Sequence, residues 1–124
     1  MKNLLSRSVG LCAVLGVLSG AAPAGTETIE IAKVQVVKLL AGVVRDHNGD
    51  PVAGATVVEI SADWKTDIQR TVTDATGHFA LPTIDKRKVH NLKISKENFD
   101  PLVVHVRISR WKAKLLNLQL HVAN

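Results

Sequence analysis

Two Asp-x-x-Gly tetrapeptides constrain the fold of this chain more than any other feature. The first runs from Asp46 to Gly49 and the second from Asp74 to Gly77, and short β-rich runs flank both. An aspartate side chain can accept hydrogen bonds from backbone amides inside its own turn, and glycine adopts the positive φ angle that a tight turn requires. The two turns therefore predict a small antiparallel β domain.

Apolar residues in the rest of the chain alternate with polar ones at a period of two, which is typical of half-buried strands. Pro51, Pro82 and Pro101 fall at strand edges, where a missing N–H does least harm, and Gly54 indicates a bulge or a close backbone approach. Seven short strands separated by turns predict an all-β, seven-stranded antiparallel β-sandwich. The expected strands cover residues 40–46, 55–62, 69–74, 78–81, 89–95, 102–109 and 113–122.

The same alternation assigns side chains to the two faces of each strand. Ala41 and Val43 share one face of the first strand, and the third strand carries Val72. His105 and Arg107 are expected to face outward. Leu92 and Ile94 are expected on one side of the strand at residues 89–95. The side chains expected to face inward are Phe79, Leu81, Val104, Val106, Ile108, Leu116, Leu118, Leu120 and Val122.

Residues 1–24 have the features of a signal peptide. Lys2 and Arg7 give a positive start, an apolar stretch covers residues 8–20, and Ala22-Pro23-Ala24 supplies the small residues that a signal peptidase requires. The apolar stretch is shorter than the roughly 20 residues that a membrane-spanning helix needs. We therefore expect cleavage after this segment and export to the periplasm or the cell exterior.

The mature chain carries no thiol, because Cys12 is the only cysteine. It can form no disulfide and offers no cysteine nucleophile or thiolate metal ligand. Loss of Lys2 and Arg7 lowers the formal net charge from +5 to +3. A modest positive charge can favour anionic partners such as lipid headgroups or acidic glycans, although solvated strand and loop faces give the same balance. Nucleic acid is not expected, because the protein is exported and no interleaved aromatics offer bases a platform.

Residues 25–38 lie between the expected signal peptide and the sandwich, which we assign to residues 39–124. Apolar residues alternate in Thr28-Ile29-Glu30-Ile31 and again in Val34-Gln35-Val36. This segment is either a lead-in strand or a linker.

The two turns belong to a longer pattern that resembles a known family. Gly42, Val44, Asp46, Gly49, Pro51, Gly54, Ala55 and Val57 match G-x-V-x-D-x-x-G-x-P-x-x-G-A-x-V, and Thr71, Thr73, Asp74, Gly77, Phe79 and Leu81 match T-x-T-D-x-x-G-x-F-x-L. Together they resemble the carboxypeptidase regulatory-like domain, which implies a sandwich of transthyretin-like (prealbumin-like) type over about residues 40–120. Asn98 stands where that family more often has glycine, and asparagine tolerates the same left-handed conformation.

The resemblance also implies a role. Domains of that family are generally appendages of peptidases, outer-membrane receptors and surface proteins, and their motif residues are structural rather than catalytic. In this chain those turn residues are Asp46, Gly49, Pro51, Gly54, Asp74 and Gly77. Similarity to starch-binding sandwiches implies carbohydrate binding as a further role. Related hydrolases end in Tyr-Arg-Gly-Ser, whereas this chain has no tyrosine.

Two tryptophans are the candidate ligand-binding residues. Trp64 lies in a polar segment between strands, and Trp111 lies before the last strand. Each ring either caps one end of the core or is exposed, and exposed tryptophans stack on sugars or anchor protein partners. A sugar site predicts that both rings are exposed and coplanar at one end of the sandwich, near Asp63 or Gln69.

Neither a metal nor a cofactor is expected. Residues 46–50 carry oxygen ligands at alternating positions but lack the later glycine and the distal glutamate of a calcium loop, so a plain turn is favoured. The histidines have no paired metal-ligand spacing, and no nucleophile elbow or phosphate-binding loop is present. The histidines are His47, His78, His90, His105 and His121.

These observations favour an exported, non-enzymatic β-sandwich that acts as an interaction or accessory module in the cell envelope. We expect a monomer whose partner is an envelope protein or a polysaccharide. The alternative is a carbohydrate-binding module that uses Trp64 and Trp111. An enzyme ranks third, because it needs convergent titratable groups that linear spacing does not reveal.

Overall fold

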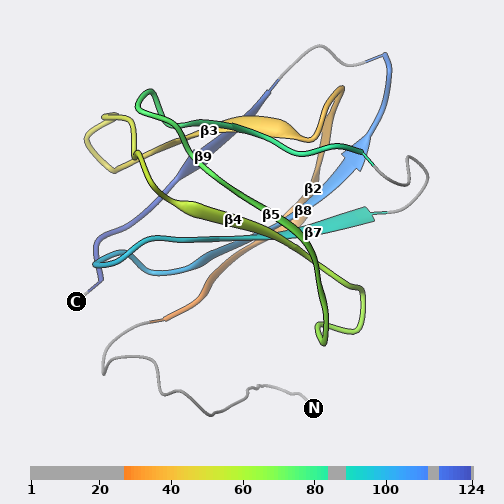
Figure 1. Cartoon of the computed structure of the whole chain (residues 1–124), viewed down its shortest axis with the longest axis horizontal. Coiled ribbons are helices and arrows are strands. Elements are labelled where there is room, and N and C mark those ends of the chain that lie inside the picture. Colours follow the sequence, from red (N-terminus) through yellow and green to blue (C-terminus); the bar gives the residue numbers. More distant parts are fainter. Residues whose placement is uncertain (1–26, 84–88, 112–114, 124) are drawn as a thin grey trace.

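The computed structural model describes residues 27–83, 89–111 and 115–123. These residues form two β-sheets and no helix, so no helix in this part of the chain could span a membrane. The strands are β2 (Ile29–Val37), β3 (Ala41–Arg45), β4 (Thr56–Ile60), β5 (Asp67–Val72), β6 (His78–Ala80), β7 (Val89–Ser95), β8 (Leu102–Ile108) and β9 (Leu116–Gln119). One sheet has the order β2-β8-β7-β4-β5 and the other β6-β3-β9 (Figure 1).

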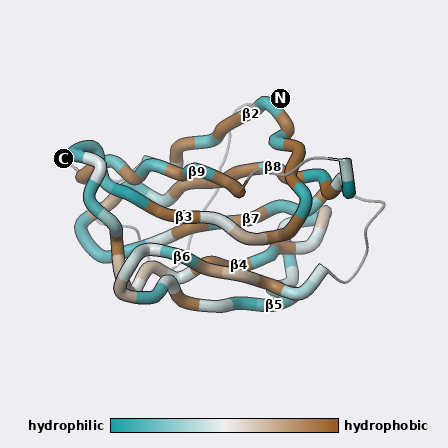
Figure 2. Tube along the Cα trace, turned by 90° about the horizontal axis from the view of Figure 1, so that it is seen from above, coloured by the Kyte–Doolittle hydropathy of each residue, from teal (hydrophilic) through white to brown (hydrophobic). Residues whose placement is uncertain are grey.

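Side chains of both sheets fill the space between them. Val57, Leu92 and Val104 of the larger sheet pack in one buried cluster with Val44 and Leu118 of the smaller sheet. Figure 2 shows hydrophobic stretches along the strands, while the turns near the C terminus are largely hydrophilic. Because each fully buried aliphatic side chain contributes about 1.5–3 kcal/mol, this shared core holds the two sheets together as a β-sandwich.

The strands β3 to β9 overlap the seven that the sequence predicts, and β2 is an additional strand within residues 25–38. Most inward assignments are confirmed, including the buried Phe79, Leu81 and Val104. Leu92 and Ile94, predicted on one side of their strand, are both buried. The inward assignment of Val122 is wrong, since its side chain is 52% exposed. The cause is that β9 ends at Gln119, and only an isolated bridge to Phe99 pairs Val122 with the rest of the fold.

The structure adds which face of two strands meets the core. In β3 Val44 pairs with the buried Leu118, and Ala41 and Val43 share the opposite face, where Val43 is also buried. In β5 the side chain of Val72 is exposed, because this strand forms the edge of the larger sheet.

The prediction of a wholly antiparallel sandwich is wrong, because each sheet contains one parallel pair. β2 pairs parallel with β8, and β3 pairs parallel with β9. The members of each pair are far apart in the sequence, so no hairpin forces them to run in opposite directions. The turn signals report only on neighbouring strands, which are antiparallel wherever a tight hairpin joins them, as in β4 and β5.

Candidate functional site

The connections between strands gather at two ends of the sandwich (Figure 1). The end formed by residues 46–55, 73–77, 96–101 and 120–123 contains both sequence motifs, and we call it the turn end. The opposite end, which we call the tryptophan end, is formed by residues 38–40, 61–66, 82–83, 109–111 and 115. β4 and β8 both run antiparallel to β7, so the segments that follow them, with Trp64 and Trp111, leave the larger sheet at the same end.

At the turn end the two aspartates are occupied by their own turns. Asp46 Oδ1 accepts the amides of Asn48 at 2.9 Å and Asp50 at 3.0 Å. Asp74 Oδ1 accepts the hydroxyl of Thr76 at 2.7 Å and the amides of Thr76 and His78. The Thr76 hydroxyl, followed by these two amides, lowers the pKa of Asp74 from its ordinary value of 3.8. Each of the two carboxylates thus accepts hydrogen bonds from groups of its own turn.

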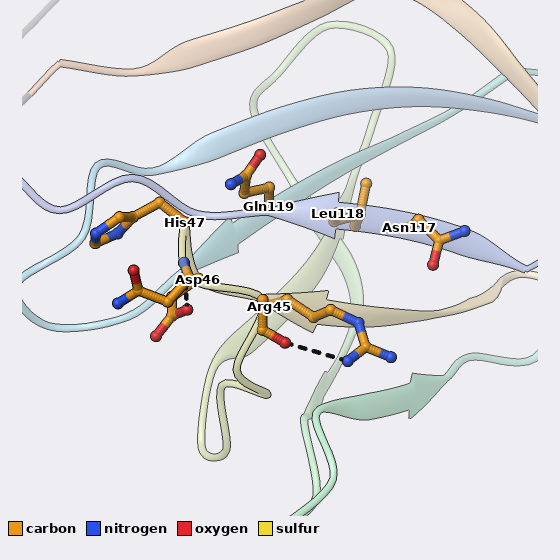
Figure 3. Close-up of a pocket in the computed structure, with 8 residues that line it drawn as sticks. Arg45, Asp46, His47, Asn117, Leu118 and Gln119 are labelled. Carbon is orange, nitrogen blue, oxygen red and sulfur yellow. Dashed lines mark hydrogen bonds between the residues drawn. The ribbon is translucent and has the colours of Figure 1, made fainter.

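A shallow hollow of about 460 Å³ lies beside the first turn (Figure 3). Residues 45–49 and 117–119 line it. Its charged groups are directed to the turn itself, since the guanidinium of Arg45 donates to the carbonyl of Gly49 and the carboxylate of Asp46 accepts turn amides. No group of three or more potential metal ligands occurs in the described parts of the chain. The hollow is therefore a weak candidate for a ligand site.

The tryptophan end exposes large apolar side chains. Trp111 is 82% exposed, Leu39 57% and Leu115 43%. The backbone brings them to one place, because the amide of Ser109 donates to the carbonyl of Val37, and β3 pairs with β9 directly after Leu39 and Leu115. Soluble domains usually bury such side chains unless the surface has a binding role.

Basic side chains accompany these apolar groups. The guanidinium of Arg110 lies 4.8 Å from the centre of the Trp111 ring, within the range of a cation–π contact. Lys38 and Arg107 are also exposed at this end. Further basic residues, Lys86, Arg87, Lys88, Lys112 and Lys114, lie outside the described residues.

Trp64 is held in a fixed position on the outer face of the larger sheet. Its φ angle is 64°, which is uncommon for a bulky residue and costs of the order of 1–3 kcal/mol. Ser61 and Asp63 fix the turn, because Asp63 Oδ1 accepts the hydroxyl of Ser61 and the amide of Lys65. The ring, 50% exposed, meets the ring of His105 edge-on, with centroids 6.2 Å apart.

Polar groups from three strands surround that contact. His105 Nε2 lies 2.6 Å from Glu30 Oε2, and His105 Nδ1 lies 2.7 Å from Asn91 Oδ1. The ring of His105 therefore lies between a carboxylate oxygen and an amide oxygen, both of which accept hydrogen bonds. Glu30, Asn91 and His105 thus link β2, β7 and β8 beside a half-exposed tryptophan.

A second acid–histidine pair is buried in the interior. Glu59 Oε2 lies 2.6 Å from His90 Nδ1, and both side chains are almost fully inaccessible to solvent. Gln69 donates to Glu59 Oε1 at 2.8 Å and to the carbonyl of Pro82. His90 Nε2 has no hydrogen-bond partner among the described residues. The pair is closed to solvent and serves the fold rather than a ligand.

The two predicted ligand-binding residues are therefore exposed at one end of the sandwich, and neither ring caps the core. The other two expected members of a sugar site are engaged elsewhere. Gln69 reaches into the interior toward Glu59, and Asp63 stabilises the turn that holds Trp64. The sequence interpretation missed Glu30, Asn91 and Glu59. The one available signal was that Glu59 occupies a core position of β4, two residues from the buried Val57.

The family model of the carboxypeptidase regulatory-like domain matches residues 40–121, from the start of the first motif to the segment after β9. No curated protein matches the chain. β2, and with it Glu30, lies outside the matched residues. Domains of this family are β-sandwich modules and are generally non-enzymatic. The match covers most of the chain and includes both turn motifs, so the chain belongs to the carboxypeptidase regulatory-like domain family.

Proposed function

We propose that the protein is an exported, non-enzymatic module of the cell envelope that binds its partner through the tryptophan end. The observation that carries the proposal is the exposure of Trp111, Leu39 and Leu115 together at one end of an otherwise well-packed sandwich. Contiguous exposed apolar groups on a soluble domain indicate an interaction surface. The signal-peptide features of residues 1–24 support export.

The first test concerns location and attachment. Cells that express the full chain are fractionated, and the mass of the recovered protein is measured. We expect the protein in the periplasm or the medium with an N-terminus at Gly25. A chain that keeps residues 1–24, found inside the cell, would contradict the export part of the proposal.

The second test compares the two ends. Leu39→Ser with Trp111→Ser removes apolar surface at the tryptophan end, whereas Val72→Ser with Val122→Ser removes exposed apolar surface near the turn end. We expect only the first pair to lower the amount of protein retained by washed envelopes. All four side chains are exposed, so both variants should remain folded, which a thermal melt verifies. Equal retention of both variants would contradict a role for the tryptophan end.

A second candidate function, carbohydrate binding, is favoured by one specific observation. Trp64 is half exposed, has a positive φ angle and meets the ring of His105, whose nitrogens lie against Glu30 and Asn91. Sugar sites combine an aromatic platform with hydrogen-bonding groups at its edge. Retention of the native protein on a polysaccharide or glycan array, lost in a folded Trp64→Ala variant, would establish this function. No retention on any glycan would remove it.

A further inference from the structure

The charges of the described residues are divided between the two ends of the sandwich. Exposed basic side chains at the tryptophan end are Lys38, Lys65, Arg107 and Arg110, with Asp63 and Asp67 as the acidic ones. At the turn end the acidic residues are Asp46, Asp50, Asp74, Glu97 and Asp100, accompanied by Lys96 and by Arg45 at the end of β3. Among the residues that the structure describes, the tryptophan end is therefore net basic and the turn end net acidic.

The basic end is also the end with the exposed apolar tip. Trp111, Leu39 and Leu115 lie there, and the ring of Trp111 stacks with Arg110. Lys38, Arg107 and Arg110 form no ion pair with any described residue. Their charges are thus available to an anionic partner.

We propose that the tryptophan end binds the surface of an anionic phospholipid membrane. Trp111, Leu39 and Leu115 enter the headgroup region, and Lys38, Arg107 and Arg110 contact the lipid phosphates. This inference rests on the proposed function, because it specifies the partner of the same surface.

The physical chemistry favours a bilayer over a protein partner. Tryptophan is enriched at membrane–water interfaces, and each basic side chain near an anionic surface adds roughly 1 kcal/mol, which corresponds to about fivefold in affinity. A protein partner would cover about 800 Å² with complementary shape, whereas a bilayer needs only an apolar tip with basic neighbours. The acidic turn end is repelled by the same surface, so the charge division orients the molecule with its tryptophan end toward the membrane.

The test follows the fluorescence of Trp111 itself. The chain has two tryptophans, so Trp64→Phe leaves Trp111 as the sole reporter and Trp111→Phe leaves Trp64. Protein recovered from cells expressing the full chain is mixed with vesicles of phosphatidylcholine, with or without phosphatidylglycerol, whose acyl chains carry bromine. We expect a blue shift and quenching of Trp111 with phosphatidylglycerol vesicles only, and weaker quenching of Trp64, which lies on the outer face of the larger sheet. If Trp64→Phe fails to fold, the difference between the native protein and Trp111→Phe gives the same quantity.

A matched pair of charge variants checks the electrostatic part. Arg107→Gln with Arg110→Gln should weaken binding to phosphatidylglycerol vesicles by roughly thirtyfold, while Arg45→Gln with Lys96→Gln at the other end should change it less than about twofold. Absence of Trp111 quenching, or equal quenching by both lipid compositions, would overturn the inference. If envelope retention still depends on Leu39 and Trp111 in that case, the proposed function stands with a protein partner. If retention does not depend on them, the membrane inference and the proposed function are both wrong.

Discussion

The two ends of the sandwich differ in whether their polar and apolar side chains have partners within the protein. At the turn end, Asp46 and Asp74 bind amides of their own turns, and the buried Thr73 joins the carbonyl of Val52 to the amide of Ala55. At the tryptophan end, apolar rings and basic side chains face solvent. The comparison teaches that the residues which define the family build the fold, while the exposed apolar and basic groups gather at the end without motif residues.

The largest expected effect is a loss of unfolding free energy when the buried Glu59–His90 pair, in the interior between the two ends, is broken. Glu59→Ala leaves His90 buried without its acidic partner, and breaking such a pair typically costs about 3–5 kcal/mol of unfolding free energy. Chemical denaturation measures this cost. The double variant Glu59→Leu with His90→Leu is the control, because replacing both partners by apolar groups is often neutral or stabilising. A loss below about 1 kcal/mol for Glu59→Ala would show that the pair is not structural.

The next largest effect is a difference in stability between alanine variants of two glycines at the turn end. A Cβ at Gly77 would lie 2.5 Å from the carbonyl oxygen of Val44, whereas a Cβ at Gly49 meets no atom within 4 Å. Both residues have positive φ angles. We expect Gly77→Ala to cost about 3 kcal/mol, from backbone strain plus the clash, and Gly49→Ala about 1 kcal/mol from strain alone. Equal losses in a denaturant titration would mean that the second turn is not packed against β3 as described.

A smaller effect concerns the positive φ angle at the tryptophan end. Trp64→Gly and Trp64→Ala remove the same contact with His105, and they differ in whether a Cβ must occupy the left-handed region. The glycine variant should be more stable by about 1 kcal/mol. Asn98, with a φ angle of 75°, supplies the matched pair at the turn end. A stability difference at Asn98 but none at Trp64 would indicate that the ring is not held in this conformation.

The smallest expected effect is a pH dependence of the unfolding free energy, to which one aspartate at each end contributes. The hydroxyls of Thr76 and Ser61 hold the pKa values of Asp74 and Asp63 below the ordinary value of 3.8. A carboxyl with a lower pKa in the folded state stabilises the fold above its unfolded pKa, and this contribution disappears as the pH falls through the folded pKa. The unfolding free energy should therefore decrease below about pH 4, and less so in Asp74→Asn. An unchanged acid profile in this variant would contradict the described turn.

The local parts of the fold could be predicted from the sequence. Asp46, Gly49, Asp74 and Gly77 form turns as expected, and Asn98 adopts the left-handed conformation that its place in the pattern suggests. These features depend on residues a few positions apart, whose intrinsic preferences agree with the final structure. The alternation of apolar residues likewise located the strands, since it reflects a local periodicity.

The features that could not be predicted from the sequence depend on the pairing of strands that are far apart in the chain. The parallel pairing of β2 with β8 and the meeting of Glu59 with His90 follow from how distant strands align. Trp64 has no intrinsic preference for a positive φ angle, and its conformation is set by the turn around Ser61 and by His105 of another strand. The candidate site was thus recognisable by residue type, through Trp64 and Trp111, but its geometry was not.

The most direct test of the contrast between the two ends is site-specific photo-cross-linking in intact cells. A photoreactive side chain is placed at Leu39 or Trp111 of the tryptophan end, and at Asn48 or Val122 of the turn end; all four positions are exposed. We expect cross-linked products with lipid or another envelope component from the first two positions and none above background from the other two. Products from all four positions, or from the turn end alone, would contradict the assignment of binding to the tryptophan end.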